Sequence, residues 1–316
     1  KYIMGTECEV DAICDGENFL IPGIMEQVER TGVHSGDSVC VYPAQHLTQA
    51  EIDTMVDYTG RFARELHVNG LVNVQYAVSN GKVYVIEVNP RASRSVPFLS
   101  KSTGVSLVDI ATKIMLGQSL ADQGITQLRR PEREKWYVKV PAFSFAKLEG
   151  MDTYLSPEMK STGEAIGYDR KLNRALYKAL QASGIKMKEY GTVIVTLADE
   201  DKAEGLPLAR RFYRLGFNIE ATEGTARFLK ENGIRTRVRR KLSDGSNEIL
   251  DSIRAGYVSY ILNTRPLSSG KHYDDGIAIR QCAVQNGVNT FTSLDTARIV
   301  LDALEEVIPE IHTIDD

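Results

Sequence analysis

The spacing of apolar residues divides the chain into two stretches with different periods. Up to residue 116, short apolar runs separated by turns such as Asp15-Gly16 predict strands paired in hairpins. Apolar positions three and four apart predict two helices in the same stretch, and Thr48 with Glu51 forms a capping-box pattern at the start of the first. The predicted elements are strands over 7–14, 19–25, 71–78 and 82–88, and helices over 48–66 and 105–116.

From Glu189 onward, apolar strands alternate regularly with amphipathic helices. This alternation predicts a parallel sheet with helices on both faces, in which ligands bind beyond the C-terminal ends of the strands. The predicted strands are 192–197, 218–221, 235–238, 257–263 and 289–291, and the predicted helices are 202–215, 224–232, 247–255, 273–286 and 294–307.

The stretch between these two patterns is irregular. Apart from a helix predicted over 165–182, its charged and proline-broken sequence indicates a linking segment. We therefore expect a chain of mixed fold class, α/β and α+β, with an antiparallel sheet first and a parallel sheet last. The expected regions are 1–116, 117–186 and 187–316.

Composition and charge narrow the classes of protein. With 316 residues, the chain is long enough for two ordinary domains, and a net charge of −4 argues against general nucleic-acid binding. No apolar run approaches the ~18 residues that span a bilayer. The four cysteines show no zinc-binding spacing, which favours reduced thiols in the cytoplasm.

Side chains with oxygen atoms occur on or directly after the two strands predicted over 71–78 and 82–88. Glu87 and Asn89 are two residues apart, so they share one face of their strand, and Gln75 lies on the neighbouring strand. These oxygens suit Mg²⁺, and Arg91 directly after the strand could hold an anion bidentately. An ordinary solvated strand face is the competing interpretation.

The hairpin register decides whether these side chains meet. A two-residue loop at Asn80-Gly81 in regular register would place Gln75 opposite Ile86, on the wrong face. We therefore expect a loop of odd length, which would place Gln75 across from Glu87.

A second string of small residues precedes this hairpin. Over residues 32–38 the sequence reads Gly-Val-His-Ser-Gly-Asp-Ser, in which glycines permit close approach of backbone amides to a ligand. His34 could reach a nucleotide's ribose or phosphate. A tight turn with an incidental histidine is an equally good interpretation of this string alone.

Together, these strings resemble the second ATP-grasp half of the carbamoyl-phosphate synthetase large subunit. The resemblance covers essentially the whole chain. It implies a partial ATP-grasp domain followed by a Rossmann-like, methylglyoxal-synthase-like domain. The strings that carry it are residues 7–16, 23–26, 32–38, 86–94, 100–105 and 157–164.

The resemblance implies roles for matching positions. Arg91 and Arg94 would bind anions near the reaction centre as catalytic residues, and the metal ligands would be Gln75, Glu87 and Asn89. The implied cofactors are ATP and Mg²⁺ or Mn²⁺, and the implied reaction is phosphorylation of carbamate. The family's covering lobe precedes the position of Lys1, so weak ATP turnover by this chain alone is expected. The residues implied to contact ATP are Tyr2, Glu7, Gly32, Val33, His34, Ser35, Gln75 and Glu87.

From about Met187 the chain resembles the family's regulatory domain, which binds nucleotide monophosphates. A Thr-rich strand end opening a helix suits phosphate, although plain helix capping or a solvated basic strand end would give similar patterns. Arg265 stands where the family has a threonine. The implied effector, UMP or IMP, would contact Lys202, Thr222, Thr225, Lys241, Asn263 and Thr264.

The resemblance also implies partners and alternatives. The expected partner is the glutaminase small subunit, and the expected assembly is a homo-oligomer of these heterodimers. The implied pathways are pyrimidine and arginine biosynthesis in the cytoplasm. Binding to nucleic acid or to a membrane is not expected. Ornithine control is not expected, since Glu29 and Asp37 match its acidic ligands but Val140 stands at the third position. The alternatives are an inactive nucleotide-binding regulatory module and a methylglyoxal synthase using Asp199 or Asp244.

Overall fold

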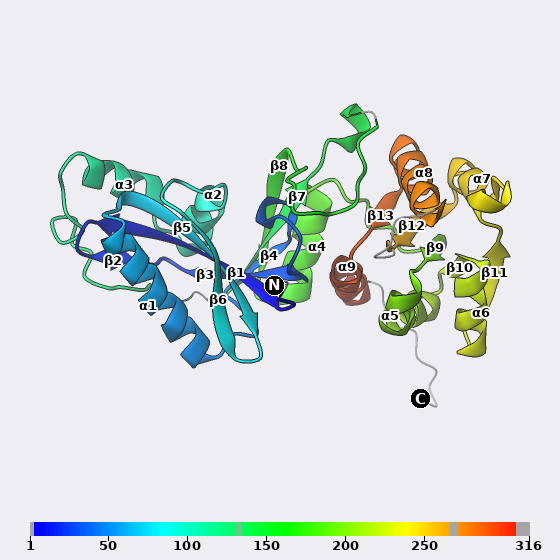
Figure 1. The fold of residues 1–316 in the computed structure, drawn as a ribbon, viewed down its shortest axis with the longest axis horizontal. Helices are drawn as coiled ribbons and strands as arrows, with labels where there is room; N and C mark the ends of the chain where they lie inside the picture. The colour runs from blue at the N-terminus through cyan, green and yellow to red at the C-terminus, as the bar shows by residue number, and fades with distance from the viewer. Residues whose placement is uncertain (1–2, 131, 133, 149, 266–270, 308–316) are drawn as a thin grey trace. The chain divides into compact units, whose positions relative to one another are not determined.

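The computed structural model describes residues 3–130, 132, 134–148, 150–265 and 271–307, without the side chains of 271–273. The chain forms two compact units, which we call the N-terminal and C-terminal units and describe separately (Figure 1). The N-terminal unit comprises Lys1–Pro141 and Glu164–Ala175. The C-terminal unit comprises Ala142–Gly163 and Leu176–Asp316.

An eight-stranded sheet forms the N-terminal unit, in the order β6-β5-β1-β3-β4-β7-β8, with β2 paired to β1. As the sequence predicted, antiparallel pairing joins β1 to β2, β3 and β5, β4 to β3 and β7, and β5 to β6. Its strands are β1 (Thr6–Asp15), β2 (Phe19–Leu20), β3 (Ile24–Arg30), β4 (Cys40–Tyr42), β5 (Asn69–Ser79), β6 (Lys82–Asn89), β7 (Trp136–Ala142) and β8 (Gly163–Asp169). Its helices are α1 (Gln49–Glu65), α2 (Val96–Thr103) and α3 (Leu107–Met115), and α4 (Leu172–Ala182) begins in it.

The two faces of this sheet are covered differently. Helix α1, which begins with the predicted Thr48–Glu51 capping box, packs on the face that carries Val10 and Tyr76. Helices α2 and α3 pack on the opposite face, in a cluster that includes Ile13, Leu71 and, on β3 and β4, Met25 and Tyr42 (Figure 1). The rest of that second face, along β1 and β5, carries polar side chains, and the candidate site lies there.

Residues 117–186 contribute more regular structure than the sequence indicated. They supply β7 and β8 to the sheet, and the helix predicted over 165–182 is wrong in its first part, because residues up to Asp169 are strand. Helix α4 begins only at Leu172. The short runs of β7 and β8 gain their strand character from pairing within the sheet, which periodicity along the chain does not report.

The β5–β6 hairpin has a different loop from the expected one but the expected pairing. Ser79 pairs with Lys82 across a two-residue loop, in which Asn80 and Gly81 both have positive φ. Further along, Gln75 pairs with Glu87 because the register shifts between Gln75 and Tyr76. The expectation of an odd-length loop was therefore wrong, and a β-bulge places the two side chains on one face instead.

The C-terminal unit contains the predicted five-stranded parallel sheet, in the order β11-β10-β9-β12-β13. Its strands are β9 (Thr192–Thr196), β10 (Asn218–Thr222), β11 (Thr236–Arg239), β12 (Val258–Asn263) and β13 (Asn289–Phe291). Its helices are α5 (Lys202–Arg214), α6 (Glu223–Glu231), α7 (Glu248–Arg254), α8 (Lys271–Gln285) and α9 (Leu294–Val307), so each predicted element is confirmed to within a few residues.

The four cysteines are all buried and unpaired. Burial raises the pKa of each thiol, to about 12 for Cys40. Among the described residues, no helix is long and apolar enough to cross a membrane.

Candidate functional site

Three adjacent strands present polar side chains in rows across the second face of the N-terminal sheet. Glu9 on β1 lies opposite Gln75 on β5, which lies opposite Glu87 on β6. The next row places Asn73 between Asp11 and Asn89. The sequence-predicted metal ligands are therefore brought together at one end of two neighbouring rows.

The loop over residues 32–38 lies against these rows. The backbone N–H of Gly32 donates to Glu7 Oε1 at 3.2 Å, and Gln75 Nε2 donates to Ser35 Oγ at 3.0 Å. His34 Nδ1 accepts from the N–H of Gly36 at 3.0 Å, so the ring proton of the neutral imidazole lies on Nε2. The loop and the strands thus form one site, with His34 Nε2 left as a donor.

The donor set of the candidate metal site suits a hard cation that shares its coordination with phosphate. Asn89 Nδ2 donates to Glu87 Oε1 at 2.8 Å, and the amide nitrogen of Gln75 is also used within the protein. Their carbonyl oxygens and the second oxygen of Glu87 therefore remain as oxygen ligands. No group of three His, Cys, Asp or Glu side chains able to hold a metal occurs in the described part of the chain.

Acidic side chains are unusually buried in this site. Glu7 is 7% exposed, and its burial, together with the nearby carboxylates of Glu9 and Glu87, raises its pKa to about 7 against the opposing Gly32 hydrogen bond. Asp11, 1% exposed, has its pKa raised to about 7 by burial and by Glu9. Burial therefore makes both carboxyl groups weaker acids than ordinary exposed carboxyl groups.

A buried lysine from β7 is the main residue that the sequence analysis missed. Lys139 is 1% exposed, and its Nζ donates to the backbone oxygen of Ser35 at 3.1 Å. Burial disfavours its charge, but the Cys40 thiol and the carboxylates of Glu9 and Glu164 hold its pKa above the ordinary value. A lone lysine in the apolar run of residues 137–141 was the available signal.

The two predicted catalytic arginines lie in different surroundings. Arg91 is exposed and donates to the backbone oxygen of Ala92, whereas Arg94 is partly buried with its Nε 3.9 Å from Glu164. They come two and five residues after the end of β6, the strand that carries Glu87 and Asn89. Tyr2, predicted to meet adenine, lies outside the described residues.

The residues discussed for ornithine lie in the interior. Glu29 and Asp37 are each 1% exposed, and Glu29 Oε2 accepts from the N–H of Val39 at 2.7 Å. Val140 is equally buried, on β7.

A cavity of about 380 Å³ lies at the C-terminal ends of the strands in the C-terminal unit. The six residues predicted to contact an effector all line it, from β10, β12, the first turns of α5 and α6, and the segments after β11 and β12. This is the position where parallel sheets bind ligands. Asp199 also lines the cavity, whereas Asp244, the other candidate acid, is absent from its lining.

The two threonines of the cavity differ in what their hydroxyls do. Thr222 precedes α6 in extended conformation, and its side chain makes no capping hydrogen bond, so the capping interpretation does not hold for it. Thr225 is 2% exposed, and its hydroxyl accepts from the N–H of Leu197 at 3.4 Å. Lys202 Nζ lies 2.6 Å from Asp199 Oδ1. Thr222 and the α6 N-terminus are therefore the better-placed phosphate donors.

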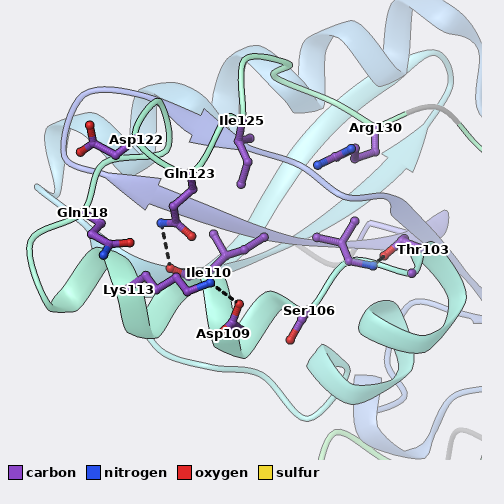
Figure 2. A pocket seen from close by; sticks show the side chains of 12 residues that line it. Thr103, Ser106, Asp109, Ile110, Lys113, Gln118, Asp122, Gln123, Ile125 and Arg130 are labelled. Atoms are coloured by element: carbon purple, nitrogen blue, oxygen red, sulfur yellow. Dashed lines mark hydrogen bonds and ion pairs between the residues drawn. The ribbon is translucent and has the colours of Figure 1, made fainter.

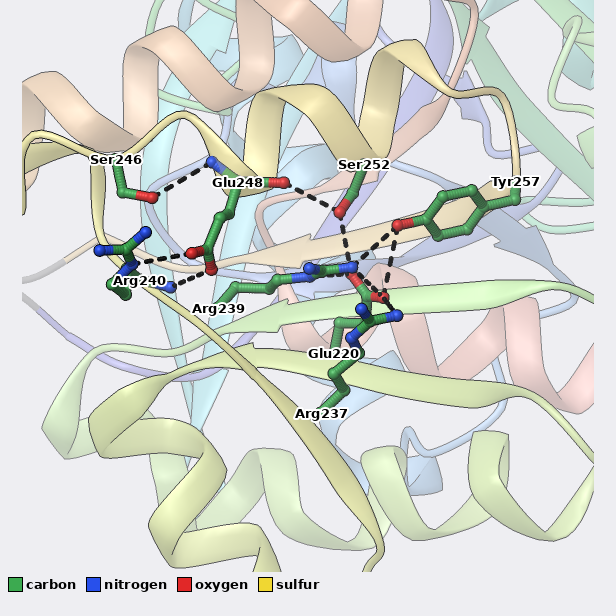
Figure 3. Close-up of polar contacts among 8 residues, drawn as sticks. All are labelled: Glu220, Arg237, Arg239, Arg240, Ser246, Glu248, Ser252 and Tyr257. Atoms are coloured by element: carbon green, nitrogen blue, oxygen red, sulfur yellow. Dashed lines mark hydrogen bonds and ion pairs between the residues drawn. The ribbon is translucent and has the colours of Figure 1, made fainter.

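A network of charged residues fixes the segment that carries Lys241 (Figure 3). Glu220 on β10 is 3% exposed and accepts two hydrogen bonds of 2.8 Å from Arg239 on β11. The next residue, Arg240, pairs with Glu248 on α7 at 2.7 Å. The two residues before Lys241 are thus each fixed by an ion pair.

A wider hollow of about 710 Å³ lies beside α3 in the N-terminal unit (Figure 2). Lys113 and Asp109, which line it, pair with each other at 2.8 Å, and Gln123 donates to the backbone of Ile110. None of the predicted site residues lines it.

Comparison with known families gives two matches along the chain. Residues 1–123 match the family model of the carbamoyl-phosphate synthase L chain, ATP binding domain. Residues 204–292 match the MGS-like domain model. The two matches, in this order, confirm the resemblance to the C-terminal part of a carbamoyl-phosphate synthetase large subunit.

Solved structures with detectable similarity include a biotin carboxylase domain of a single-chain bacterial carboxylase, 17% identical with a TM-score of 0.45. That match covers 59% of this chain and 48% of the other. The Kluyveromyces lactis urea carboxylase is 18% identical with a TM-score of 0.44, over 56% of this chain and 18% of the other. The chain thus spans less than half the length of these two proteins.

Proposed function

We propose that this chain is the C-terminal part of a carbamoyl-phosphate synthetase large subunit. Its N-terminal unit would hold MgATP for the phosphorylation of carbamate, and its C-terminal unit would bind a nucleotide monophosphate effector. The observation that carries this proposal is the bulged hairpin, which sets Gln75 opposite Glu87 beside the loop over residues 32–38.

Each side chain of the site has a task in this reaction. Glu7 accepts a hydrogen bond from the ribose, and His34 Nε2 donates to an oxygen of the nucleotide. Lys139 fixes Ser35, so the loop amides are positioned before ATP arrives. Arg91 and Arg94 neutralise the charge of carbamate and of the transferred phosphoryl group.

Gln75, Glu87 and Asn89 would hold Mg²⁺ or Mn²⁺ together with phosphate oxygens. The ion would supply charge neutralisation at the β- and γ-phosphates.

The reverse reaction tests the N-terminal assignment. We expect the intact large subunit to form ATP from MgADP and carbamoyl phosphate, and Glu87→Gln to lower this rate at least about 100-fold, because a phosphate-neutralising ligand set is lost. Glu65→Gln, an exposed substitution near the end of α1, should leave the rate unchanged. An unaltered rate in Glu87→Gln would place the metal elsewhere.

The C-terminal cavity is the proposed effector site. Its basic residues, threonines and helix N-terminus favour a phosphate-bearing nucleotide, with UMP preferred over IMP as the first ligand to titrate. The glutaminase subunit and the assembly of heterodimers are proposed as partners on the resemblance alone.

A methylglyoxal synthase reaction is the second candidate, because the carboxylate of Asp199 lines the phosphate-type cavity. Its ion pair with Lys202 would have to open for acid–base chemistry. An assay with dihydroxyacetone phosphate decides this, since release of methylglyoxal and phosphate would favour the lyase over the effector site.

A further inference from the structure

A fully buried arginine lies directly behind the effector cavity. Arg280 on α8 is 1% exposed, and it is absent from the lining of the cavity although its neighbours Gly276 and Ile279 contribute to it. A buried guanidinium is stable only with well-placed acceptors. The hydrogen-bond acceptors of Arg280 therefore indicate its structural role.

Arg280 connects a segment that is distant along the chain to a residue of the cavity. Its Nε and Nη2 donate to the two carboxylate oxygens of Asp152 at 2.5 and 2.7 Å, and its Nη1 donates to Asn263 Oδ1. Burial would raise the pKa of Asp152, but the hydrogen bond and charge of Arg280 outweigh it and hold that pKa below the ordinary value. The bidentate contact fixes the plane of the guanidinium.

This fixed plane determines how Asn263 faces a ligand. With its Oδ1 bound by Arg280, Asn263 donates from Nδ2 to Thr196 Oγ1 at 2.7 Å. A Cβ atom at Gly276 would lie only 2.9 Å from Arg280 Nη1, so the arrangement leaves no spare room. The second N–H of the Asn263 amide is then the group offered to an acceptor in the cavity.

A second contact ties the same segment to the rim of the cavity. Arg265, two residues after Asn263, lies with its guanidinium carbon 4.7 Å from the centre of the Tyr154 ring. Asp152 and Tyr154 both belong to residues 142–163, which run from the last residue of β7 to the first residue of β8. We call residues 142–163 the excursion.

We propose that Asp152 and Arg280 are positioning residues of the effector cavity, so that docking of the excursion and binding of a nucleotide monophosphate stabilise each other. The inference rests on the proposed effector site and adds that ligand binding there is coupled to docking of the excursion. With Asp152 docked, the Asn263 amide is oriented for an acceptor oxygen. By reciprocity, a ligand that uses this amide favours the docked excursion.

The first test is titration of UMP into the full chain by calorimetry. We expect Asp152→Ala to bind UMP about tenfold more weakly than the wild type, within the usual range of coupling between sites. Tyr154→Ala, which leaves no buried charge unpaired, should also weaken binding. Glu158→Gln removes an exposed carboxylate from the same excursion and should bind like the wild type.

The second test needs no ligand. The N–H of Ala198 donates to Thr264 Oγ1 at 2.9 Å and that of Thr264 donates to the backbone oxygen of Thr196 at 3.1 Å, at the cavity rim. Hydrogen exchange at these two amides should be faster in Asp152→Ala than in wild type or Glu158→Gln. Unchanged exchange in Asp152→Ala overturns the inference, whichever ligand binds.

The two proposals fail in distinguishable ways. If the wild type binds neither UMP, IMP nor inorganic phosphate, the effector site is wrong, and the exchange experiment alone decides on the positioning residues. If the wild type binds UMP and Asp152→Ala and Tyr154→Ala bind it equally well, the effector site stands and the positioning role is refuted.

Discussion

At the scale of single residues, the N-terminal site combines two carboxyl groups, Glu7 and Asp11, whose pKa burial raises, with a buried lysine whose pKa is also raised. Glu9 receives hydrogen bonds from Asn73 and Ser95 at 2.8 and 3.1 Å, while Lys139 faces it from β7. Such a set is costly to bury and is tolerated where it arranges a functional surface. The free energy of unfolding should therefore depend on pH.

Asp11→Asn should remove part of that dependence. The pKa of Asp11 is about 7 in the folded chain and 3.8 when unperturbed, so the unfolded chain loses its proton first and the free energy of unfolding falls as pH rises through this window. The variant should therefore gain roughly 1–3 kcal/mol over wild type at pH 8 and little at pH 4. Trp136, the chain's one tryptophan, lies on β7 and reports urea unfolding of this unit.

The control for this measurement is Asp57→Asn on the exposed face of α1. It should follow the wild-type pH profile, including the part that comes from Glu7. If Asp11→Asn is less stable than wild type at pH 8, its carboxylate is ionised and stabilising in the folded chain.

Lys241→Ala tests the effector cavity at the same scale. A charged hydrogen bond contributes roughly 1.5–3 kcal/mol, so UMP should bind about one to two orders of magnitude more weakly by calorimetry. Lys230→Ala, an exposed lysine of α6 outside the cavity, should not change the affinity. Thr222→Ala is the cleaner threonine variant, because the Thr225 hydroxyl also bonds the backbone at the end of β9.

At the scale of elements, the bulge in β6 changes which residues of the strand point to each face of the sheet. Val83 and Val88 both pack on the α1 side, yet five positions separate them, which a regular strand would place on opposite faces. Ile86, 47% exposed, is the extra residue that restores the alternation for Val88 and Glu87 together. This break in parity is present in the sequence and could have predicted the bulge.

Deletion of Ile86 should therefore be tolerated. The remaining residues would keep Gln75 opposite Glu87 in regular register, so we expect a free energy of unfolding within about 1 kcal/mol of wild type by urea titration with Trp136 fluorescence. Deletion of Val88 should cost about 2–5 kcal/mol, because it empties a core position and turns Asn89 toward it. Equal damage from both deletions would show that the bulge itself is needed.

The elements that the sequence missed are those with the fewest residues or the weakest periodicity. The parallel sheet was predictable because each strand of the C-terminal unit is an apolar run bounded by an amphipathic helix. Three-residue β4 and the edge strand β8 carry no such pattern, and both pair with β7. Lys139 was missed for the same reason, since its role depends on a strand that periodicity did not reveal.

At the scale of the whole molecule, the predicted site residues fall into two groups, one in each unit. The described residues that line the effector cavity belong to the C-terminal unit, and the rows of carboxylates and amides belong to the N-terminal unit. The sequence indicated this division through its change of period, but not that residues 142–163 belong with the C-terminal unit.

Hydrogen exchange with and without UMP should show whether the two units unfold independently. At a UMP concentration 100 times the dissociation constant, globally exchanging amides of β9, β10 and β12 should be protected by about 2.7 kcal/mol. Amides of β1 and β5 should not change, because no described residue of the N-terminal unit lines the effector cavity. Equal protection in both sheets would show that the two units unfold together.

The burial of all four thiols makes the native chain a convenient background for site-directed labelling. Alkylating reagents attack the thiolate, and raised pKa values with closed surroundings suppress it at every natural cysteine. Iodoacetamide at pH 7 should therefore modify the folded chain far more slowly than the urea-unfolded chain, as mass spectrometry would show. A cysteine introduced at exposed Glu158 could then carry a single fluorophore and report the excursion directly, without removal of any native cysteine.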